Sequence, residues 1–340
     1  MALSGNVVAA ELATPAGQSK RRPGVRLFNL LAPFLGLLLV IGLFSLSSTV
    51  RSYFLTGANF KIIFIQTVIV AIGSLGMTLI IVSGGIDLSV GSVVALTSVV
   101  GASALLKGAP PMIAAALMIA MGAGIGFLNG LVIGVGRMVP FIVTLGMMGI
   151  ARGMAKWIAN SQTVNPPDNA LNNLMVLNDP AHFFPLPPGV WITVGLAILM
   201  AVVMRRTVFG RYAFAIGANE AAARLSGVRV GLQKVLIYTF AGLFFGAAGM
   251  MQLARLTQGD PTVAIGLELD IIAAVVIGGA SLNGGSGSIL GSLVGALIMA
   301  VLRNGSNQMG WPTYMQEIII GVVIVLAVAV DKVRQAKLKM

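Results

Sequence analysis

Long apolar runs separated by short polar segments dominate this chain. A helix needs about 20 apolar residues to cross the hydrocarbon core of a bilayer, and on that measure the pattern predicts about ten transmembrane helices. Polar or glycine-rich breaks within the pattern predict broken or re-entrant segments, so the expected fold is an all-α polytopic membrane protein. The expected spans lie at about 30–49, 61–82, 90–107, 111–135, 139–158, 189–204, 235–253, 268–281, 287–303 and 314–330.

Composition supports the membrane assignment, because 57% of the residues are hydrophobic and only 9% are charged. Such a chain does not have enough polar surface for a water-soluble globule. We expect an N-terminal tail at 1–28, a transmembrane domain at 29–332 and a C-terminal tail at 333–340. Two longer polar connections stand out, at 159–188 and at 205–234.

The distribution of basic residues predicts the orientation of the chain. With an even number of spans and the N-terminus inside, roughly two-thirds of the 22 lysines and arginines fall on inner segments, as the positive-inside rule requires. Both tails and the 205–234 segment are therefore expected in the cytoplasm, and the 159–188 loop outside. The net charge of +12 is explained by this asymmetry, and we expect no nucleic-acid partner.

Within the 205–234 segment, the pattern predicts a short capped helix. Asn219 is a suitable N-cap, Glu220 lies in the first turn, Arg224 stands four residues later for an ion pair, and Gly227 can end the helix. About two turns of helix are not stable alone in water. We therefore expect this helix to be held by other contacts and to serve as a docking element.

Glycine gathers in two related passages, at 80–96 and at 274–297. Each has an apolar run, a Gly-Gly pair, a polar break and a helix studded with glycine and serine. The two passages indicate an internal repeat, as in many transporters, although small residues also recur for helix packing alone. The expected topology gives both passages the same orientation, so the repeat would be parallel.

Asp87 is the acidic residue deepest among the apolar runs. One interpretation places it on a translocation path, because acids within a membrane are costly and often functional. The interpretation that we favour is an N-cap for a helix starting at Leu88, assisted by Ser89 and Ser92. For Glu268 and Asp270, at the start of a later run, we expect charges that compensate the helix dipole.

Uncharged hydrogen-bonding groups in or near the spans form a second set of candidates. A neutral polyol would need such a lining, yet polar contacts between helices explain the same residues. The candidates for the translocation path are Asp87, Ser89, Gln66, Asn129 and Asn283.

Several chemistries have no support in the sequence. There is no cysteine and a single histidine, His182, so we expect no metal site. No phosphate-binding loop of the G-x-x-x-x-G-K-[ST] type occurs, and no paired acids or activated nucleophile stand out. We expect a chain without catalytic residues or cofactor.

The sequence resembles the ribose-type permease subunits of bacterial ATP-binding-cassette (ABC) importers. The resemblance is carried by SGGIDLSVGS at 83–92, GRYAFAIGANEAAARLSGVRV at 210–230 and a long match over 254–305, and it extends from about 28 to 332. It implies a permease dimer in the bacterial inner membrane, a cytoplasmic ATP-binding subunit and an extracytoplasmic sugar-binding protein. The positions that it implies for docking the ATP-binding subunit are Gly217, Asn219, Glu220, Ala222, Arg224 and Gly227.

Two points stay open at the level of sequence. The N-terminus and the 159–188 loop depart from the family pattern, which leaves the sugar and the choice between homodimer and heterodimer undetermined. A self-sufficient secondary transporter or facilitator is the alternative function, and a membrane scaffold without transport activity is disfavoured by the polar breaks within spans.

Overall fold

The computed structural model describes residues 23–48, 50–177 and 186–339, and within these ranges it consists of helices and connecting loops. Most of the expected N-terminal tail and the central part of the 159–188 loop, with His182, lie outside the described residues. The helices are α1 (Pro23–Leu46), α2 (Arg51–Phe54), α3 (Gly57–Val82), α4 (Val90–Leu106), α5 (Pro111–Gly134), α6 (Pro140–Ile158), η1 (Asn172–Leu174), α7 (Pro188–Arg206), α8 (Val208–Ala218), α9 (Glu220–Leu225), α10 (Val230–Leu256), α11 (Leu267–Ile277), α12 (Ile289–Gln308) and α13 (Thr313–Lys339).

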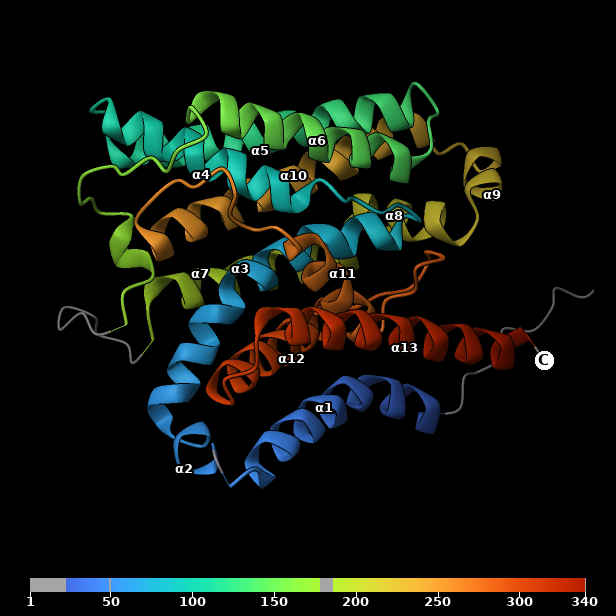
Figure 1. Ribbon diagram of the computed structural model, residues 1–340. Coiled ribbons are helices and arrows are strands. Elements are labelled where there is room, and N and C mark those ends of the chain that lie inside the picture. Colours follow the sequence, from blue (N-terminus) through green and yellow to red (C-terminus); the bar gives the residue numbers. More distant parts are fainter. Residues whose placement is uncertain (1–22, 49, 178–185, 340) are drawn as a thin grey trace, which may run out of the picture.

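The long helices run back and forth between two ends of the molecule (Figure 1). One end carries α9, the start of α1 and the end of α13, and we call it the α9 end. The opposite end carries α2 and η1, and we call it the η1 end. The first and last described residues therefore lie at the same end, as an even number of crossings requires.

Each of the ten expected spans falls on a helix, but the helices differ in length. Six are long and apolar enough to cross a membrane, namely α3, α5, α6, α7, α10 and α12, and α1, α4 and α13 contain shorter apolar stretches. By contrast α11 has 11 residues and extends for only about 16 Å. The expected span at 268–281 is thus a short helix that ends within the bundle. At the C-terminus, α13 continues through the expected tail to Lys339.

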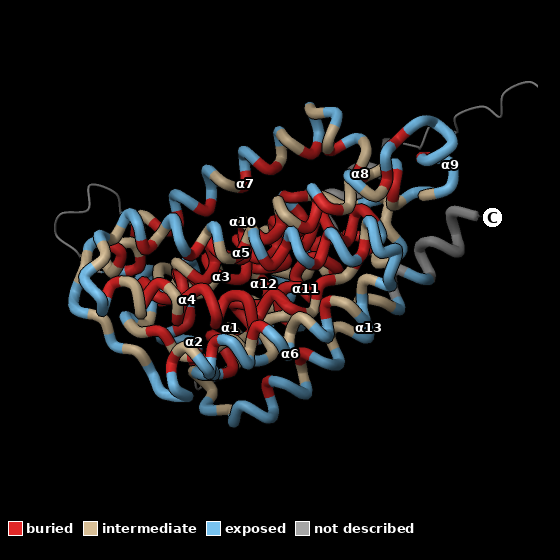
Figure 2. Tube along the Cα trace, turned by 90° about the horizontal axis from the view of Figure 1, so that it is seen from above, coloured by how far each residue is buried: buried red, intermediate tan, exposed pale blue. Residues whose placement is uncertain are grey.

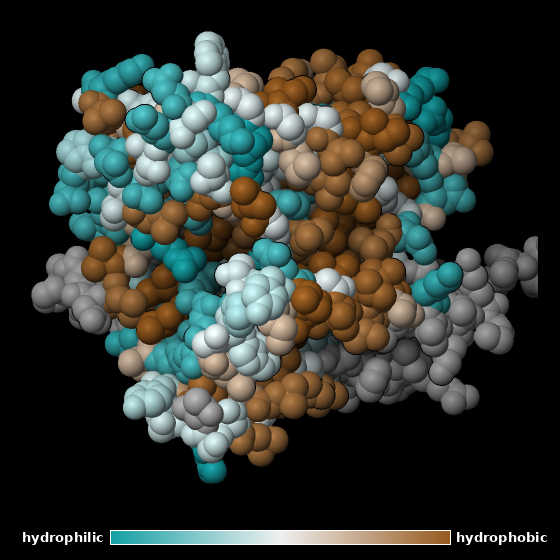
Figure 3. All heavy atoms as spheres, in the orientation of Figure 1, coloured by the Kyte–Doolittle hydropathy of each residue, from teal (hydrophilic) through white to brown (hydrophobic). Residues whose placement is uncertain are grey.

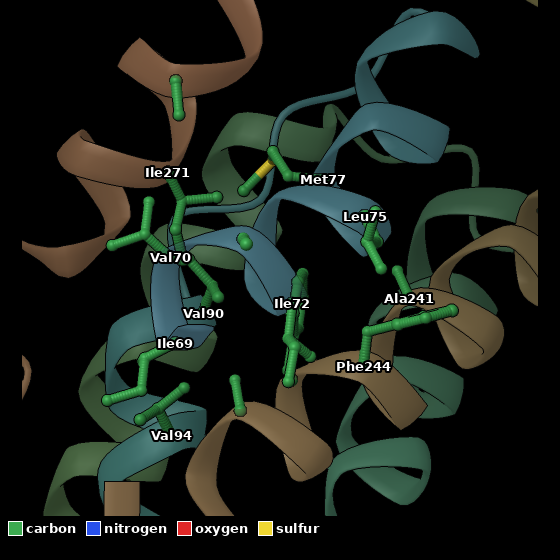
Figure 4. Packing of buried hydrophobic residues seen from close by; sticks show 14 of the residues in the cluster. Ile69, Val70, Ile72, Leu75, Met77, Val90, Val94, Ala241, Phe244 and Ile271 are labelled. Atoms are coloured by element: carbon green, nitrogen blue, oxygen red, sulfur yellow. The ribbon is translucent and has the colours of Figure 1, made fainter. Parts of the chain in front are cut away.

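The centre of the bundle is α3, in which 89% of the most apolar stretch is buried, against 17% in α6 and 33% in α7 (Figure 2). Its side chains interlock with those of α4, α10 and α11, for example Ile72 with Phe244 and Val70 with Ile271 (Figure 4).

Glycines bring α5 and α10 unusually close. A Cβ added at Gly126 would lie 3.1 Å from the Cα of Gly242, and one at Gly246 would lie 2.6 Å from the Met118 carbonyl oxygen. Such backbone contacts are typical of membrane helices, where small residues replace the hydrophobic effect as the basis of packing.

Apolar side chains are exposed along the outer helices. Leu38, Leu39 and Leu43 of α1 are each more than 60% exposed, as are Ile198 of α7 and Val325 of α13. On the face shown in Figure 3, apolar side chains cover the middle of the molecule and polar side chains gather toward its ends. An exposed apolar belt between polar ends is the surface that a bilayer requires.

Candidate functional site

The short helix expected between Asn219 and Gly227 is present as α9. The Asn219 side chain accepts a hydrogen bond from the Ala222 N–H at 3.0 Å, which confirms the N-cap. Gly227 has a φ of +85°, and the Val228 N–H beyond it donates to the Ala223 carbonyl at 3.1 Å. A left-handed residue is the usual way to close a helix C-terminus, and glycine adopts it without strain.

Two kinds of contact hold α9 to the rest of the molecule. Ala223 packs in a small apolar cluster with Ile216, Val228 and Val230. Glu220 forms ion pairs with Arg224 at 2.9 Å, as expected, and with Lys234 of α10 at 2.7 Å, which the sequence reasoning missed. The Lys234 hydrogen bond is the main reason why the pKa of the Glu220 carboxyl is lowered from its ordinary value. Glu220 therefore anchors α9, while Arg224 remains half exposed.

Leu225, the last residue of α9, is 89% exposed. Ala221 and Ala222 are also exposed, so the helix presents an apolar tip beside the Glu220–Arg224 pair. Sequence reasoning concentrated on the charged pair and overlooked this side chain, although a leucine in a polar segment was a visible signal. An exposed apolar tip on an anchored helix is suited to enter a pocket of a partner protein.

The expected glycine passages meet at Gly217, which lies at the end of α8 just before α9. The Gly285 N–H donates to the Val82 carbonyl at 2.8 Å. A Cβ added at Gly284 would lie 2.7 Å from the Gly217 carbonyl oxygen and 3.0 Å from the Gly84 Cα. The break after α3, the break before α12 and the end of α8 thus touch through backbone atoms. Both breaks face the α9 end, which agrees with the expected parallel orientation.

A pocket of about 300 Å³ lies beside this three-way contact. Asn283, one of the path candidates, lines it together with Glu220, Lys234 and Tyr238. The pocket therefore joins the α9 anchor to the glycine breaks.

A separate buried cluster is formed by Asp87, Ser89 and Asn129. These residues do not line this pocket, nor do they line a second pocket near the η1 end, which is described next. The Asp87 carboxylate accepts hydrogen bonds from the Ser89 N–H at 2.7 Å and the Ser89 hydroxyl at 2.5 Å. Asn129 of α5 donates to Ser89 at 3.2 Å. Helix α4 begins at Val90 and its N-cap position is Ser89, so the expected N-cap at Asp87 is wrong: the Asp87 side chain closes a turn with Ser89 just before the helix.

Gln66 lines a second pocket of about 300 Å³, near the η1 end. Gln252, Asp270 and Arg303 also line it, and Asp270 pairs with Arg303 at 2.6 Å. Glu268 and Asp270 both lie in the first turn of α11, where the expected dipole compensation places them, and Asp270, which is only 3% exposed, also engages a cation on α12. Glu268 interacts locally, since it accepts from the Gly266 N–H at 3.3 Å. Asp270 was missed as a pocket residue because its partner lies 33 positions away.

The path candidates are thus divided among three places. Gln66 lies near the η1 end, Asn283 lies beside α9, and the other three form the buried cluster. These positions match a membrane protein with one polar pocket toward each end and an apolar core between them.

Comparison with known proteins identifies the family. The family model described as "Branched-chain amino acid transport system / permease component" matches residues 59–328. The ribose import permease protein RbsC of Escherichia coli K12 is 42% identical over 300 residues, which cover 88% of this chain and 93% of that protein. The Bacillus subtilis protein of the same name is 38% identical over 307 residues, 90% of this chain and 94% of that protein.

A third relative has a different sugar in its name. The fructose import permease protein FrcC of Rhizobium meliloti is 35% identical over 301 residues, covering 87% of this chain and 84% of that protein. No solved structure matches the chain. From the matched residues and the helical membrane architecture, the chain belongs to this family of transport-system permease components.

Proposed function

We propose that this chain is the membrane-spanning subunit of an ABC importer for a monosaccharide, either a pentose, a hexose or a related polyol. The observation that carries the proposal is α9, an anchored helix with an exposed apolar tip, which directly follows Gly217 of α8, the residue that touches both glycine breaks. The names of the relatives, two ribose permeases and a fructose permease, support a sugar as the substrate.

In this proposal α9 docks an ATP-binding subunit, so the α9 end faces the cytoplasm and both termini lie there. The positions involved are Gly217, Asn219, Glu220, Ala222, Arg224 and Gly227, to which we add Leu225. Asn219, Glu220 and Gly227 hold the helix in place. Arg224 and Leu225 remain exposed for the partner.

The three-way glycine contact provides a route for coupling. Closure of an ATP-binding dimer would push α9 and the end of α8, and the Gly217 backbone would then displace the breaks after α3 and before α12. Both breaks adjoin the pocket lined by Asn283, so this pocket would open or close with the ATP cycle. Such differential contacts between two states are what an energy-coupled transporter requires.

The proposal includes two further partners. A sugar-binding protein would deliver substrate to the η1 end, where the second polar pocket lies. A second permease, identical or similar, would complete the translocation path through one of the exposed apolar faces.

Reconstitution tests the proposal. Proteoliposomes containing the full chain with its ATP-binding subunit and sugar-binding protein should accumulate radiolabelled D-ribose or D-fructose only when ATP is supplied to the α9 side. Vesicles with the chain alone, under a proton or sodium gradient, serve as the comparison. Uptake by the chain alone would refute the proposal and establish a secondary transporter or facilitator instead.

A further inference from the structure

Two arginines line the pocket near the η1 end, and only one of them has an acidic partner. Arg303 of α12 pairs with Asp270 of α11 at 2.6 Å. Arg255, in the last turn of α10, forms no hydrogen bond or ion pair with any residue that the structure describes. The charged group that acts on it is Arg303, which repels it, and the nearby acid Glu268 is not part of the lining. Within the described chain, the pocket therefore has one positive charge without a counter-charge.

The groups that a ligand in this pocket can reach are hydrogen-bond donors. Arg255 is exposed, and the Arg303 side chain is 36% exposed. Asn307 is exposed too, and because its side-chain oxygen already accepts a hydrogen bond from α13 at 2.7 Å, its NH₂ group remains to donate. By contrast Asp270 Oδ1 and Gln66 Oε1 are buried out of reach of the pocket. The accessible surface is thus cationic and donates, while the acid is sealed behind it.

An uncompensated cation among donors requires an anion, and the chemistry of the donors restricts which one. The two oxygens of a carboxylate match the planar fork of a guanidinium group, and a carboxylate carries the single negative charge that the pocket lacks. We infer that the η1-end pocket binds a small organic acid, whose carboxylate lies between Arg255 and the outer nitrogens of Arg303. This ligand is additional to the sugar of the proposed function, and the inference does not depend on that function.

The shape of the pocket restricts the size and the source of the anion. A volume of about 300 Å³ lies at the small end of the range for small-molecule sites, which suits an acid of monosaccharide size. The walls come from α3, α10, α11, α12 and the loop before α11, and the pocket does not open between the outer helices α1, α6, α7 and α13. A solute from the aqueous phase at the η1 end is therefore favoured over a lipid headgroup.

The loop that precedes α11 fixes one wall of the pocket. Arg152 of α6 donates to the carbonyl oxygens of Pro261 and Val263 at 2.8 and 2.7 Å. Farther along, the same loop contributes Ala264 and Ile265 to the lining. A wall that is already held in place reduces the cost of binding, because fewer groups must be ordered by the ligand.

The absence of cysteine from the chain permits a direct test of the charge. Ile265 is 74% exposed, so an Ile265→Cys variant of the full chain in nanodiscs is treated with a sulfonate and with a trimethylammonium methanethiosulfonate reagent. Adding Arg255→Gln should lower the ratio of the sulfonate rate to the trimethylammonium rate about fivefold, because one unit charge acts on both reagents in opposite directions. The matched control is Lys107→Gln, which removes an exposed cation at the end of α4 outside the pocket and should leave the ratio unchanged.

Protection of the same thiol tests the ligand. D-gluconate at saturation should slow the modification roughly threefold or more, because a bound acid fills the space beside residue 265. D-sorbitol, its neutral six-carbon counterpart, should not slow it. Arg255→Lys keeps the charge but not the planar fork, so this variant should keep the ratio of reagent rates and lose most of the protection by D-gluconate.

Four results would overturn the inference. They are an unchanged ratio of reagent rates in Arg255→Gln, equal protection by D-gluconate and D-sorbitol, equal protection by D-gluconate and by sodium chloride at the same ionic strength, and protection by an acidic extracytoplasmic protein alone. The last result would assign the free charge to a protein contact. ATP-dependent uptake of D-ribose by the reconstituted importer is measured separately, so the proposed function can fail or stand whatever the outcome here.

Discussion

Truncation of Leu225 separates docking from folding. The side chain is 89% exposed in the chain alone, so Leu225→Ala removes almost no contact within the permease. If the side chain is buried in the ATP-binding subunit, the change removes about three carbon groups at about 0.8 kcal/mol each, or about 2.4 kcal/mol of association free energy. We therefore expect about 50-fold weaker binding of the ATP-binding subunit.

Interferometry provides the measurement, with the full chain immobilised in nanodiscs and the ATP-binding subunit titrated over it. The matched control is Leu46→Ala, because Leu46 is 84% exposed and ends α1 at the η1 end. The control should bind with the affinity of the unmodified chain, and both variants should keep its melting temperature. A dissociation constant within threefold of the unmodified value for Leu225→Ala would refute the role assigned to the α9 tip.

Three other changes test the α9 anchor, the glycine contact and the buried Asp87 cluster. Glu220→Gln leaves the Lys234 ammonium unpaired, which should lower stability by no more than about 1 kcal/mol because the pair is partly exposed. Since the pKa of Glu220 is lowered from 4.5, the stability that its charge contributes should persist at neutral pH and disappear as the pH falls below 4.5. The measurement is the difference in melting temperature between the unmodified chain and the variant, and a difference that does not change with pH would contradict this. Gly217→Ala places a Cβ 2.7 Å from the Gly285 nitrogen and should uncouple ATP hydrolysis from uptake, whereas normal coupling ratios would argue against the glycine route. Asp87→Asn preserves the turn at Ser89 and should keep uptake within threefold; a complete loss would instead indicate a proton-carrying acid.

Hydropathy was sufficient to locate every long helix, because the length of an apolar run is a direct requirement of the bilayer. The short helix α9 was also predictable, since capping depends on residues within one or two turns of each other. The Asn219 cap and the Glu220–Arg224 pair were predicted correctly for that reason.

Contacts between distant segments could not be predicted in the same way. Lys234 reaches Glu220 from 14 positions away, and Arg303 reaches Asp270 from 33 positions away, so no local pattern relates them. The Asp87 error has a different cause. A D-x-S pattern fits both an N-cap and a turn before the helix, and only the backbone geometry distinguishes them.

The glycine contact at Gly217 has a thermodynamic consequence. Packed side chains can accommodate a small displacement by changing rotamer. Backbone atoms that are already in contact cannot do so, and a displacement of one segment must therefore move the other. If motion of α9 shifts the breaks after α3 and before α12, then a ligand that stabilises one arrangement of those breaks must alter the affinity of α9 for its partner by the same factor. A ligand in the pocket lined by Asn283 would thus change the affinity of α9 for the ATP-binding subunit.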